Sequence, residues 1–308
     1  MSLFLVFLGL ALLFGGGELL VRGSVALARR LGVSEIAVGV VLVGFGTSAP
    51  ELLVSIESAI LDHADLALGN VLGSNIANIL LIVGLAAVVT PIRLSAGVGW
   101  REAAIVLVAT CLVTVLALVG SLGLWQGILM LAALAAYLVF CWRVPGPEDA
   151  EIAEDEGPPT GTGRAALLAL GGLLLLIVGA DLLVEGAIDI ALDFGVSEST
   201  IGLTIVAVGS SLPELAASTI AAFRGRPSVA IGNVLGSNLF NLLGALGIVA
   251  VITPVSTAGI DVHFSLLAML AVTGCFVALV AARRVGRPIG AVFLALYAGF
   301  VSLHFSVA

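Results

Sequence analysis

Two short segments of the chain combine glycine, hydroxyl and proline residues with one glutamate, inside stretches that are otherwise apolar. Their sequences are GFGTSAPE at 44–51 and AVGSSLPE at 207–214. Proline has no N–H group and clashes with the preceding helical turn, so we expect the carbonyl oxygens near residues 44 to 46 and 207 to 209 to lose their helical partners. Together with side-chain oxygens they would form an all-oxygen ligand set, which suits hard cations such as Na⁺ and Ca²⁺. The candidate side chains are Thr47, Ser48, Glu51, Ser210, Ser211 and Glu214.

Each glutamate is followed, 23 residues later, by a serine and, 27 residues later, by an asparagine. These residues are Ser74 and Asn78 in the first case and Ser237 and Asn241 in the second. Residues four positions apart share one face of a helix, so each serine and its asparagine can face the same cavity. The structural alternative is that these small and polar residues only join helices to one another inside a membrane.

The composition places both glutamates among helices that cross a lipid bilayer. Of 308 residues, 60% are hydrophobic and 10% are charged, against roughly 25% charged in soluble domains. Apolar runs of about 20 residues, enough for a helix to cross a ~30 Å hydrocarbon core, recur along the whole chain. We predict an all-α polytopic membrane protein with ten transmembrane helices, near 3–21, 36–60, 67–90, 100–120, 123–142, 165–184, 199–223, 230–252, 264–282 and 287–306. A carboxylate at mid-membrane costs at least about 2.5 to 3.5 kcal/mol, so two of them indicate a function.

The basic residues predict how these helices are oriented. The chain contains no lysine, and its 12 basic residues are all arginines. All of them lie in alternate loops of the ten-helix arrangement, beginning with the loop after the first helix. Because basic loops stay in the cytoplasm, both termini are expected to be extracellular.

The chain also repeats itself once. A shift of 163 residues aligns 32–91 with 195–254 without a gap, and the sequence GNVLGSN occurs at both 69–75 and 232–238. Five helices per copy is an odd number, so the two copies must cross the membrane in opposite directions, as in inverted-repeat transporters. The predicted organisation is a first five-helix repeat at 1–142, an acidic cytoplasmic linker at 143–164 and a second five-helix repeat at 165–308.

These segments resemble the duplicated motifs of the calcium/cation antiporter superfamily, in particular prokaryotic sodium/calcium exchangers. The resemblance covers nearly the whole chain and rests on the two Pro-Glu segments and the repeated GNVLGSN. It implies exchange of Ca²⁺ for Na⁺ by alternating access, with these ions as cargo and no cofactor. By this resemblance, calcium would be held by Glu51, Glu214, Thr47 and Ser210, and sodium would also use the carbonyl oxygens of Gly44 and Ala207 and the hydroxyls of Ser74 and Ser237.

The chain departs from that family at two of these positions. Ser210 stands where threonine is usual, which keeps the hydroxyl, and Asn241 stands where sodium-coupled members often have aspartate. Two ionised carboxylates are neutralised by one Ca²⁺ or by two Na⁺, whereas a third Na⁺ would leave one positive charge in a low-dielectric site. The number of sodium ions therefore stays open at this point.

Other functions compete with this interpretation. A proton/calcium antiporter would use the same two glutamates, and Asn241 favours it mildly over a design with three carboxylates. The inverted duplication argues against a cation channel. A membrane enzyme is weakest, because the sequence has no nucleophile and base pair, metalloprotease motif or nucleotide-binding loop.

The remaining expectations concern location and partners. The cysteines Cys111, Cys141 and Cys275 have no paired spacing, so we expect neither disulfides nor a zinc site. The lipid bilayer is the expected surrounding, and a prokaryotic plasma membrane is the expected location. We expect neither nucleic acid nor an obligate protein partner.

Overall fold

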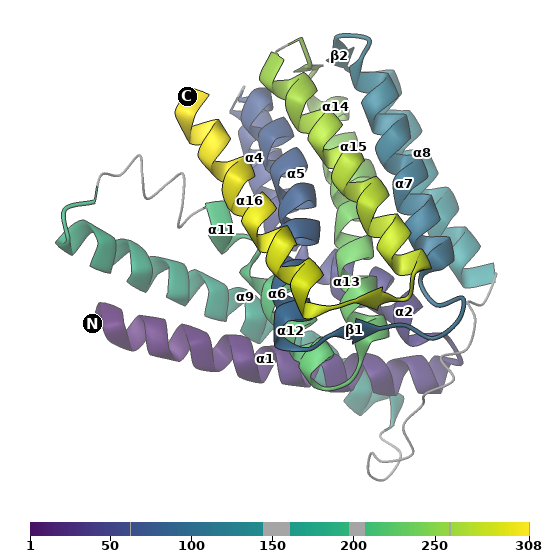
Figure 1. Cartoon of the computed structure of the whole chain (residues 1–308), viewed down its shortest axis with the longest axis vertical. Helices are drawn as coiled ribbons and strands as arrows, with labels where there is room; N and C mark the ends of the chain where they lie inside the picture. The colour runs from purple at the N-terminus through teal and green to yellow at the C-terminus, as the bar shows by residue number, and fades with distance from the viewer. Residues whose placement is uncertain (62, 144–160, 197–206, 259, 308) are drawn as a thin grey trace.

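The computed structural model describes residues 1–61, 63–143, 161–196, 207–258 and 260–307. Nearly all of them are helical, as predicted (Figure 1). Residues 144–160 of the predicted linker and the beginning of the helix predicted at 199–223 lie outside the described residues. The first half of the chain forms α1 (Ser2–Leu31), α2 (Glu35–Val38), the π-helical segment η1 (Gly39–Gly44), α3 (Phe45–Thr47), α4 (Ala49–Ile60), α5 (Ala64–Ala77), η2 (Asn78–Val83), α6 (Gly84–Val89), α7 (Trp100–Ala117) and α8 (Leu124–Arg143). The second half forms α9 (Thr162–Asp193), α11 (Ala207–Gly209), α12 (Leu212–Phe223), α13 (Pro227–Leu239), η4 (Phe240–Ala245), α14 (Leu246–Ile252), α15 (Ile260–Ala281) and α16 (Arg287–Val307).

The described helices agree with a chain that crosses the membrane many times. Seven helical stretches are long and apolar enough to span a bilayer. An eighth span is obtained if residues Glu35–Thr47 and helix α4, which meet at a bend of 44°, are counted together as one broken helix. The apolar helices Leu212–Phe223 and Arg287–Leu303 are shorter than a full span. Each predicted segment therefore contains a described helix, while the count of ten spans and the side of the termini stay predictions.

Two helices are longer than their apolar runs predicted. The prediction placed them at 3–21 and 165–184, whereas α1 covers Ser2–Leu31 and α9 covers Thr162–Asp193. Arginine and glutamate favour helices, so a charged residue ends the apolar run without ending the helix. Helix α1 ends only at Gly32, whose φ of 66° lies in the left-handed region that glycine adopts without strain.

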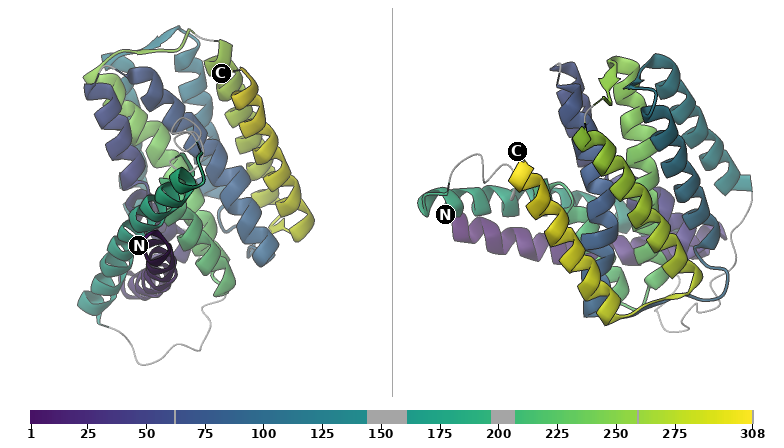
Figure 2. Two further views of the ribbon diagram at one scale, coloured as in Figure 1. Left: turned by 90° about the vertical axis from the view of Figure 1, so that its left-hand side faces the viewer. Right: turned by 45° about the horizontal axis from the view of Figure 1, so that its top comes forward.

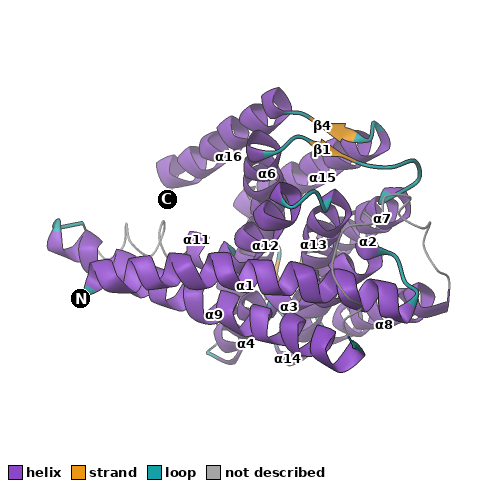
Figure 3. Cartoon of the chain, turned by 90° about the horizontal axis from the view of Figure 1, so that it is seen from below, coloured by secondary structure: helices purple, strands orange, loops and turns teal. Residues whose placement is uncertain are grey.

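Helices α1 and α9 pack against each other along most of their length and cross the other helices obliquely (Figures 1 and 3). Glycines repeat every seven residues on the facing sides, and each glycine of α1 has a counterpart 163 residues later on α9. A Cβ atom at Gly16 would lie 2.8 Å from the carbonyl oxygen of Gly172, which leaves no room for a side chain. The glycines are Gly9, Gly16 and Gly23 on α1 and Gly172, Gly179 and Gly186 on α9. Inside lipid, such close backbone contact is a main source of helix association.

Two short antiparallel ladders join the halves of the chain. Strand β1 (Ile92–Arg93) pairs with β4 (Arg284–Val285), and β2 (Ser121–Leu122) pairs with β3 (Val255–Ser256). The ladders lie near opposite ends of the bundle (Figure 1). These strands are too short to be recognised from an alternating sequence pattern.

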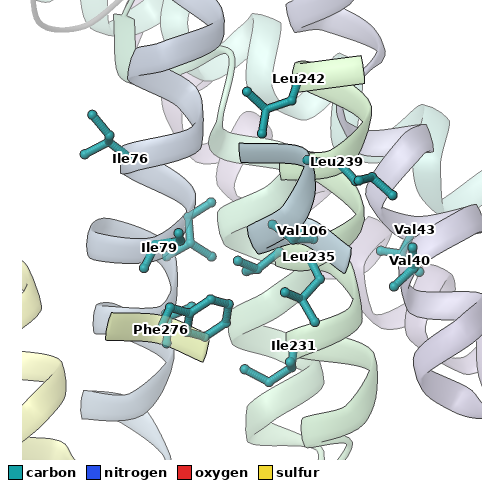
Figure 4. Close-up of a cluster of buried hydrophobic side chains, with 14 of the residues drawn as sticks. Val40, Val43, Ile76, Ile79, Val106, Ile231, Leu235, Leu239, Leu242 and Phe276 are labelled. Atoms are coloured by element: carbon teal, nitrogen blue, oxygen red, sulfur yellow. The ribbon is translucent and has the colours of Figure 1, made fainter. Parts of the chain in front are cut away.

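Helix α13 lies at the centre of the bundle, and every residue from Ser228 to Leu239 is buried. Its apolar residues meet side chains from η1, η2, α7 and α15, including Val40, Ile79 and Phe276 (Figure 4). The three orientations of Figures 1 and 2 show the upright helices gathered around it, with α1 and α9 projecting to one side. The rigid centre therefore carries one of the two GNVLGSN motifs.

Candidate cation site

The two glutamates lie at equivalent points of two broken helices. Glu51 is in the first turn of α4 and Glu214 is in the first turn of α12. The preceding residues, Ser48 (φ −82°, ψ 9°) and Ser211 (φ −89°, ψ 4°), interrupt the helices. Proline follows in the first turn of the next half-helix, where its missing N–H group would have no intrahelical partner. Both glutamates are 1% exposed, and the positive end of a helix favours a carboxylate there.

Each copy of the repeat donates a hydrogen bond to the carboxylate of the other copy. The Ser48 hydroxyl donates to Oε1 of Glu214 at 2.9 Å, and the Ser211 hydroxyl donates to Oε1 of Glu51 at 3.3 Å. The Oε2 atoms of both glutamates are buried and have no hydrogen-bond partner among the described residues. Because buried carboxylate oxygens normally have partners, these two oxygens are suited to bind a cation.

The carbonyl oxygen of Gly44 corrects one sequence-based expectation. It accepts hydrogen bonds from the Ser48 N–H group at 3.2 Å and from the Ser237 hydroxyl at 3.1 Å, so it keeps its helical partner. The reason is spacing: Pro50 removes the donor that lies four residues after Gly46, and the donor for Gly44 is Ser48. Two members of the sodium ligand set that the resemblance implies, Ser237 and the Gly44 carbonyl, therefore lie side by side.

The other predicted hydroxyl ligands differ in their exposure: some are buried, and one lines a cavity. Thr47 is completely buried and contacts α13, and Ser74 is 7% exposed on α5. Ser210 lies in the wall of a cavity described below. Ala207 is the first residue of the short helix α11, and its side chain lies outside the described residues.

The two asparagines predicted to face the site are both buried at the starts of π-helical segments. Asn78 Nδ2 donates to Oδ1 of Asn238 at 3.0 Å, while its own Oδ1 has no partner among the described residues. Asn241 is completely buried, and neither its Nδ2 nor its Oδ1 has a described partner. An amide oxygen without a donor is a suitable neutral ligand for Na⁺ or Ca²⁺. Among the described residues, no three or more histidine, cysteine, aspartate and glutamate side chains are close enough together to hold a metal ion by themselves.

Sequence reasoning missed the role of two further asparagines. Asn70 donates to the backbone carbonyl oxygen of Glu51 at 3.1 Å, and Asn233 donates to that of Glu214 at 3.2 Å. Both belong to the repeated GNVLGSN sequence, 19 residues after their glutamates. That repeated position was the available signal, although spacing alone gives no reason to expect a bond to the backbone.

A cavity of about 550 Å³ reaches the site from one side. Its inner wall includes Pro50, Asn70, Ser210 and Pro213, and its outer wall carries three acidic residues of α9. We call these residues, Asp181, Glu185 and Asp189, the acidic mouth. Within the described part of the chain, this cavity therefore joins the acidic mouth to Ser210, one of the predicted ligands.

The opposite side of the site is closed by arginine ion pairs. Arg226 donates to Glu35 at 2.9 Å, with both side chains buried, and Glu18 lies between Arg22 at 2.5 Å and Arg224 at 2.6 Å. We call the region of these residues the arginine side. The space beside Arg22, Arg224 and Arg226 measures about 30 Å³, far less than the cavity at the acidic mouth.

Comparison with known proteins links this arrangement to one family. The family model described as "Sodium/calcium exchanger protein" matches residues 1–143 and 164–305. The chain is 38% identical to the putative antiporter CaxA of Alkalimonas amylolytica, over 98% of each protein. It is 30% identical to the sodium/calcium exchanger MaX1 of Methanosarcina acetivorans, also over 98% of each protein.

The fold has a counterpart among solved structures. The structure of the sodium-calcium exchanger NCX_Mj soaked without Na⁺ and Ca²⁺ matches with a TM-score of 0.87 and 30% sequence identity, covering 98% of both chains. The matched region thus includes both broken helices and both copies of GNVLGSN.

Proposed function

This chain belongs to the sodium/calcium exchanger protein family, a family of membrane transporters, and on that premise we propose that it exchanges Ca²⁺ for Na⁺ across the membrane. The observation that carries the proposal is the reciprocal contact between copies at Glu51 and Glu214. Each carboxylate is buried, receives a hydroxyl from the other copy, and keeps one oxygen without a described partner. Such a centre can bind a small cation that has lost most of its water.

Charge balance explains why the two ions would compete. The carboxylate pair is neutralised by one Ca²⁺ or by two Na⁺, and the neutral oxygens around it can accommodate either ion. The empty pair would remain charged, and moving it through lipid would be costly. We propose that only ion-loaded forms change sides, which couples the movement of one ion to that of the other.

The proposed ligand set follows the sequence-based assignment. Calcium is bound by Glu51 and Glu214 with the hydroxyls of Thr47 and Ser210. Sodium additionally uses the carbonyl oxygens of Gly44 and Ala207 and the hydroxyls of Ser74 and Ser237. Asn78 and Asn241 line the same centre with amide oxygens, and Ser48 and Ser211 hold the carboxylates in place.

The proposed orientation places the acidic mouth outside the cell. The arginines predict that their loops are cytoplasmic, and the arginine side of the site contains Arg22, Arg224 and Arg226. Both termini would then be extracellular, and the described conformation would be open to the outside. Extracellular cations would enter past the carboxylates of Asp181 and Glu185.

The test is uptake of radioactive calcium into vesicles that contain the purified protein and either Na⁺ or choline. We expect uptake only with internal Na⁺, and loss of uptake in Glu51→Gln and in Glu214→Gln. Glu57→Gln is the matched control, because Glu57 lies on the same helix as Glu51 but is exposed. Uptake that ignores Na⁺ and follows an imposed pH gradient would replace sodium coupling by proton coupling. Uptake that survives both glutamate substitutions would refute the site.

A further inference from the structure

Asn233 connects a glutamate-bearing helix to the other copy of the repeat. Its Nδ2 atom donates to the backbone carbonyl of Glu214 at 3.2 Å and to the Ser218 hydroxyl at 2.8 Å, which uses both amide protons. Its Oδ1 atom therefore needs a donor, and the Thr47 hydroxyl lies 3.1 Å away. Thr47 is also 3.0 Å from the Val43 carbonyl, but a completely buried amide oxygen is normally hydrogen-bonded, and Thr47 is its only donor among the described residues.

Asn70 holds the other glutamate-bearing helix in the same way but lacks the second connection. Its Nδ2 atom donates to the backbone carbonyl of Glu51 at 3.1 Å and to the Ser55 hydroxyl at 3.0 Å. The residue equivalent to Thr47 is Ser210, and within the described chain Ser210 makes no hydrogen bond to Asn70. Both residues instead line the cavity below the acidic mouth. The hydrogen bond between Thr47 and Asn233 is thus formed on the arginine side, and the equivalent bond between Ser210 and Asn70 is not formed on the side of the acidic mouth.

Backbone packing supports the closed contact at Asn233. A Cβ atom at Gly232 would lie 2.7 Å from the carbonyl oxygen of Ile36, so α13 and α2 are in direct contact. The helices are therefore closed around the Asn233 contact.

We propose that Asn70 and Asn233 are positioning residues whose side-chain oxygens close the two passages to the site in turn. Asn233 accepts from Thr47 when the arginine side is closed, and Asn70 accepts from Ser210 when the acidic mouth is closed. The amide protons hold Glu51 and Glu214 through their backbone carbonyls in both conformations. The inference rests on the proposed exchange function, because only a transporter that alternates between two openings needs both contacts.

The test measures how open each side is, without any ion flux. Two single-cysteine reporters are made, Val54→Cys in the wall of the cavity and Val25→Cys at a buried position beside the arginine side. The background is a variant in which the native cysteines Cys111, Cys141 and Cys275 are replaced by serine. Labelling by a small charged thiol reagent is followed in detergent and in choline buffer, so that both sides meet the same reagent.

Removing the asparagine of one copy or of the other should change the ratio of the two labelling rates in opposite directions. Asn233→Ala should raise the labelling rate of the Val25→Cys reporter relative to the Val54→Cys reporter by about five-fold, the change that one hydrogen bond produces in a two-state ratio. Asn70→Ala should lower the same ratio by a similar factor, because it removes a contact of the other conformation. The bonds from Asn70 and Asn233 to the glutamate backbone are proposed to exist in both conformations. Their loss should therefore affect both conformations equally and leave the ratio of the labelling rates unchanged.

Two further substitutions keep the test decisive if an asparagine variant folds poorly. Thr47→Val and Ser210→Ala remove the hydroxyl of the contact between copies and leave the amide bonds to the glutamate backbone in place; the choline buffer holds no Na⁺ or Ca²⁺, so a loss of ion ligands does not enter this measurement. They should therefore reproduce the two opposite shifts.

Two outcomes would overturn this inference. Shifts in the same direction for Asn233→Ala and Asn70→Ala would mean that both amides only hold their helices. Unchanged ratios in Thr47→Val and Ser210→Ala would mean that the contacts do not select a side. A wild-type chain that carries no calcium in the vesicle experiment would overturn the proposed function, whatever the labelling shows.

Discussion

Loss of either partner of the ion pair between Arg226 and Glu35 should destabilise the protein far more than loss of the neighbouring exposed pair. Arg226 Nη1 lies 2.9 Å from Glu35 Oε1, and the side chains are 6% and 7% exposed. Two unit charges about 4 Å apart attract by about 4 kcal/mol at an effective dielectric constant near 20. Removing one partner of a buried pair costs about 3 to 5 kcal/mol, because the other charge loses the interaction that offset its burial.

The assay is thermal unfolding of purified variants in detergent. For a chain of this size, 1 kcal/mol corresponds to roughly 2 °C, so Arg226→Met and Glu35→Gln should each unfold about 6 to 10 °C below the wild type. The double variant removes both charges of this pair and should recover at least half of that loss.

Arg224→Met is the matched control for these variants. Arg224 lies 2.6 Å from Glu18 but is 44% exposed, and exposed pairs contribute about 0 to 1 kcal/mol, so we expect a loss of at most about 2 °C. The reasoning is refuted if the Arg226 and Glu35 variants lose no more than this control. It is equally refuted if the double variant is as unstable as the two single losses added together.

Three further predictions concern the site and the packing around it. Ser48→Ala and Ser211→Ala should each raise the calcium concentration for half-maximal uptake by about ten-fold, because a hydrogen bond to a charged group contributes about 1.5 to 3 kcal/mol; an effect in only one copy would contradict the reciprocal arrangement. Gly16→Val should prevent α1 from packing, since a Cβ there lies 2.8 Å from backbone atoms of α9, whereas Gly15→Val meets nothing within 4 Å and should fold and transport normally. Asn241→Leu should raise the unfolding temperature without ions by a few degrees, because a buried amide without partners costs about 1 to 3 kcal/mol, and should reduce the stabilisation by added Na⁺; equal stabilisation of both proteins by Na⁺ would exclude the amide as a ligand.

The sequence was sufficient to predict a mostly helical membrane protein and to single out the two Pro-Glu segments that the fold brings together. Hydrophobic run length and the repeat at 163 residues depend on local pattern, and both Pro-Glu segments are recognisable in that pattern alone. The contact between Ser48 and Glu214 joins residues 166 positions apart, so only the packing of the two copies reveals which hydroxyl meets which carboxylate. Local spacing had placed each hydroxyl only beside the glutamate of its own copy.

Other features of the structure had no readable signal in the sequence. The π-helical segments at Gly39–Gly44, Asn78–Val83 and Phe240–Ala245 depend on how a helix adapts to its neighbours. Arg226 was interpreted only as a loop residue that reports orientation, yet it is buried against Glu35, 191 residues away. A buried ion pair between distant segments is a product of tertiary packing, and neither residue is unusual within its own stretch of sequence.

The close packing of α1 against α9 gives the surrounding lipid a part in the working of this protein. Side chains on the outer faces of the pair, such as Phe7 and Leu167, are largely exposed and would contact acyl chains. If the pair slides along its own length, it exchanges acyl-chain contacts for other acyl-chain contacts, while charged residues such as Arg22 and Asp189 stay near the headgroups. Bilayer thickness would then set the two resting positions of the pair, and bilayer viscosity would set the friction between them. In that case the membrane would act as a mechanical component of the protein as well as its solvent.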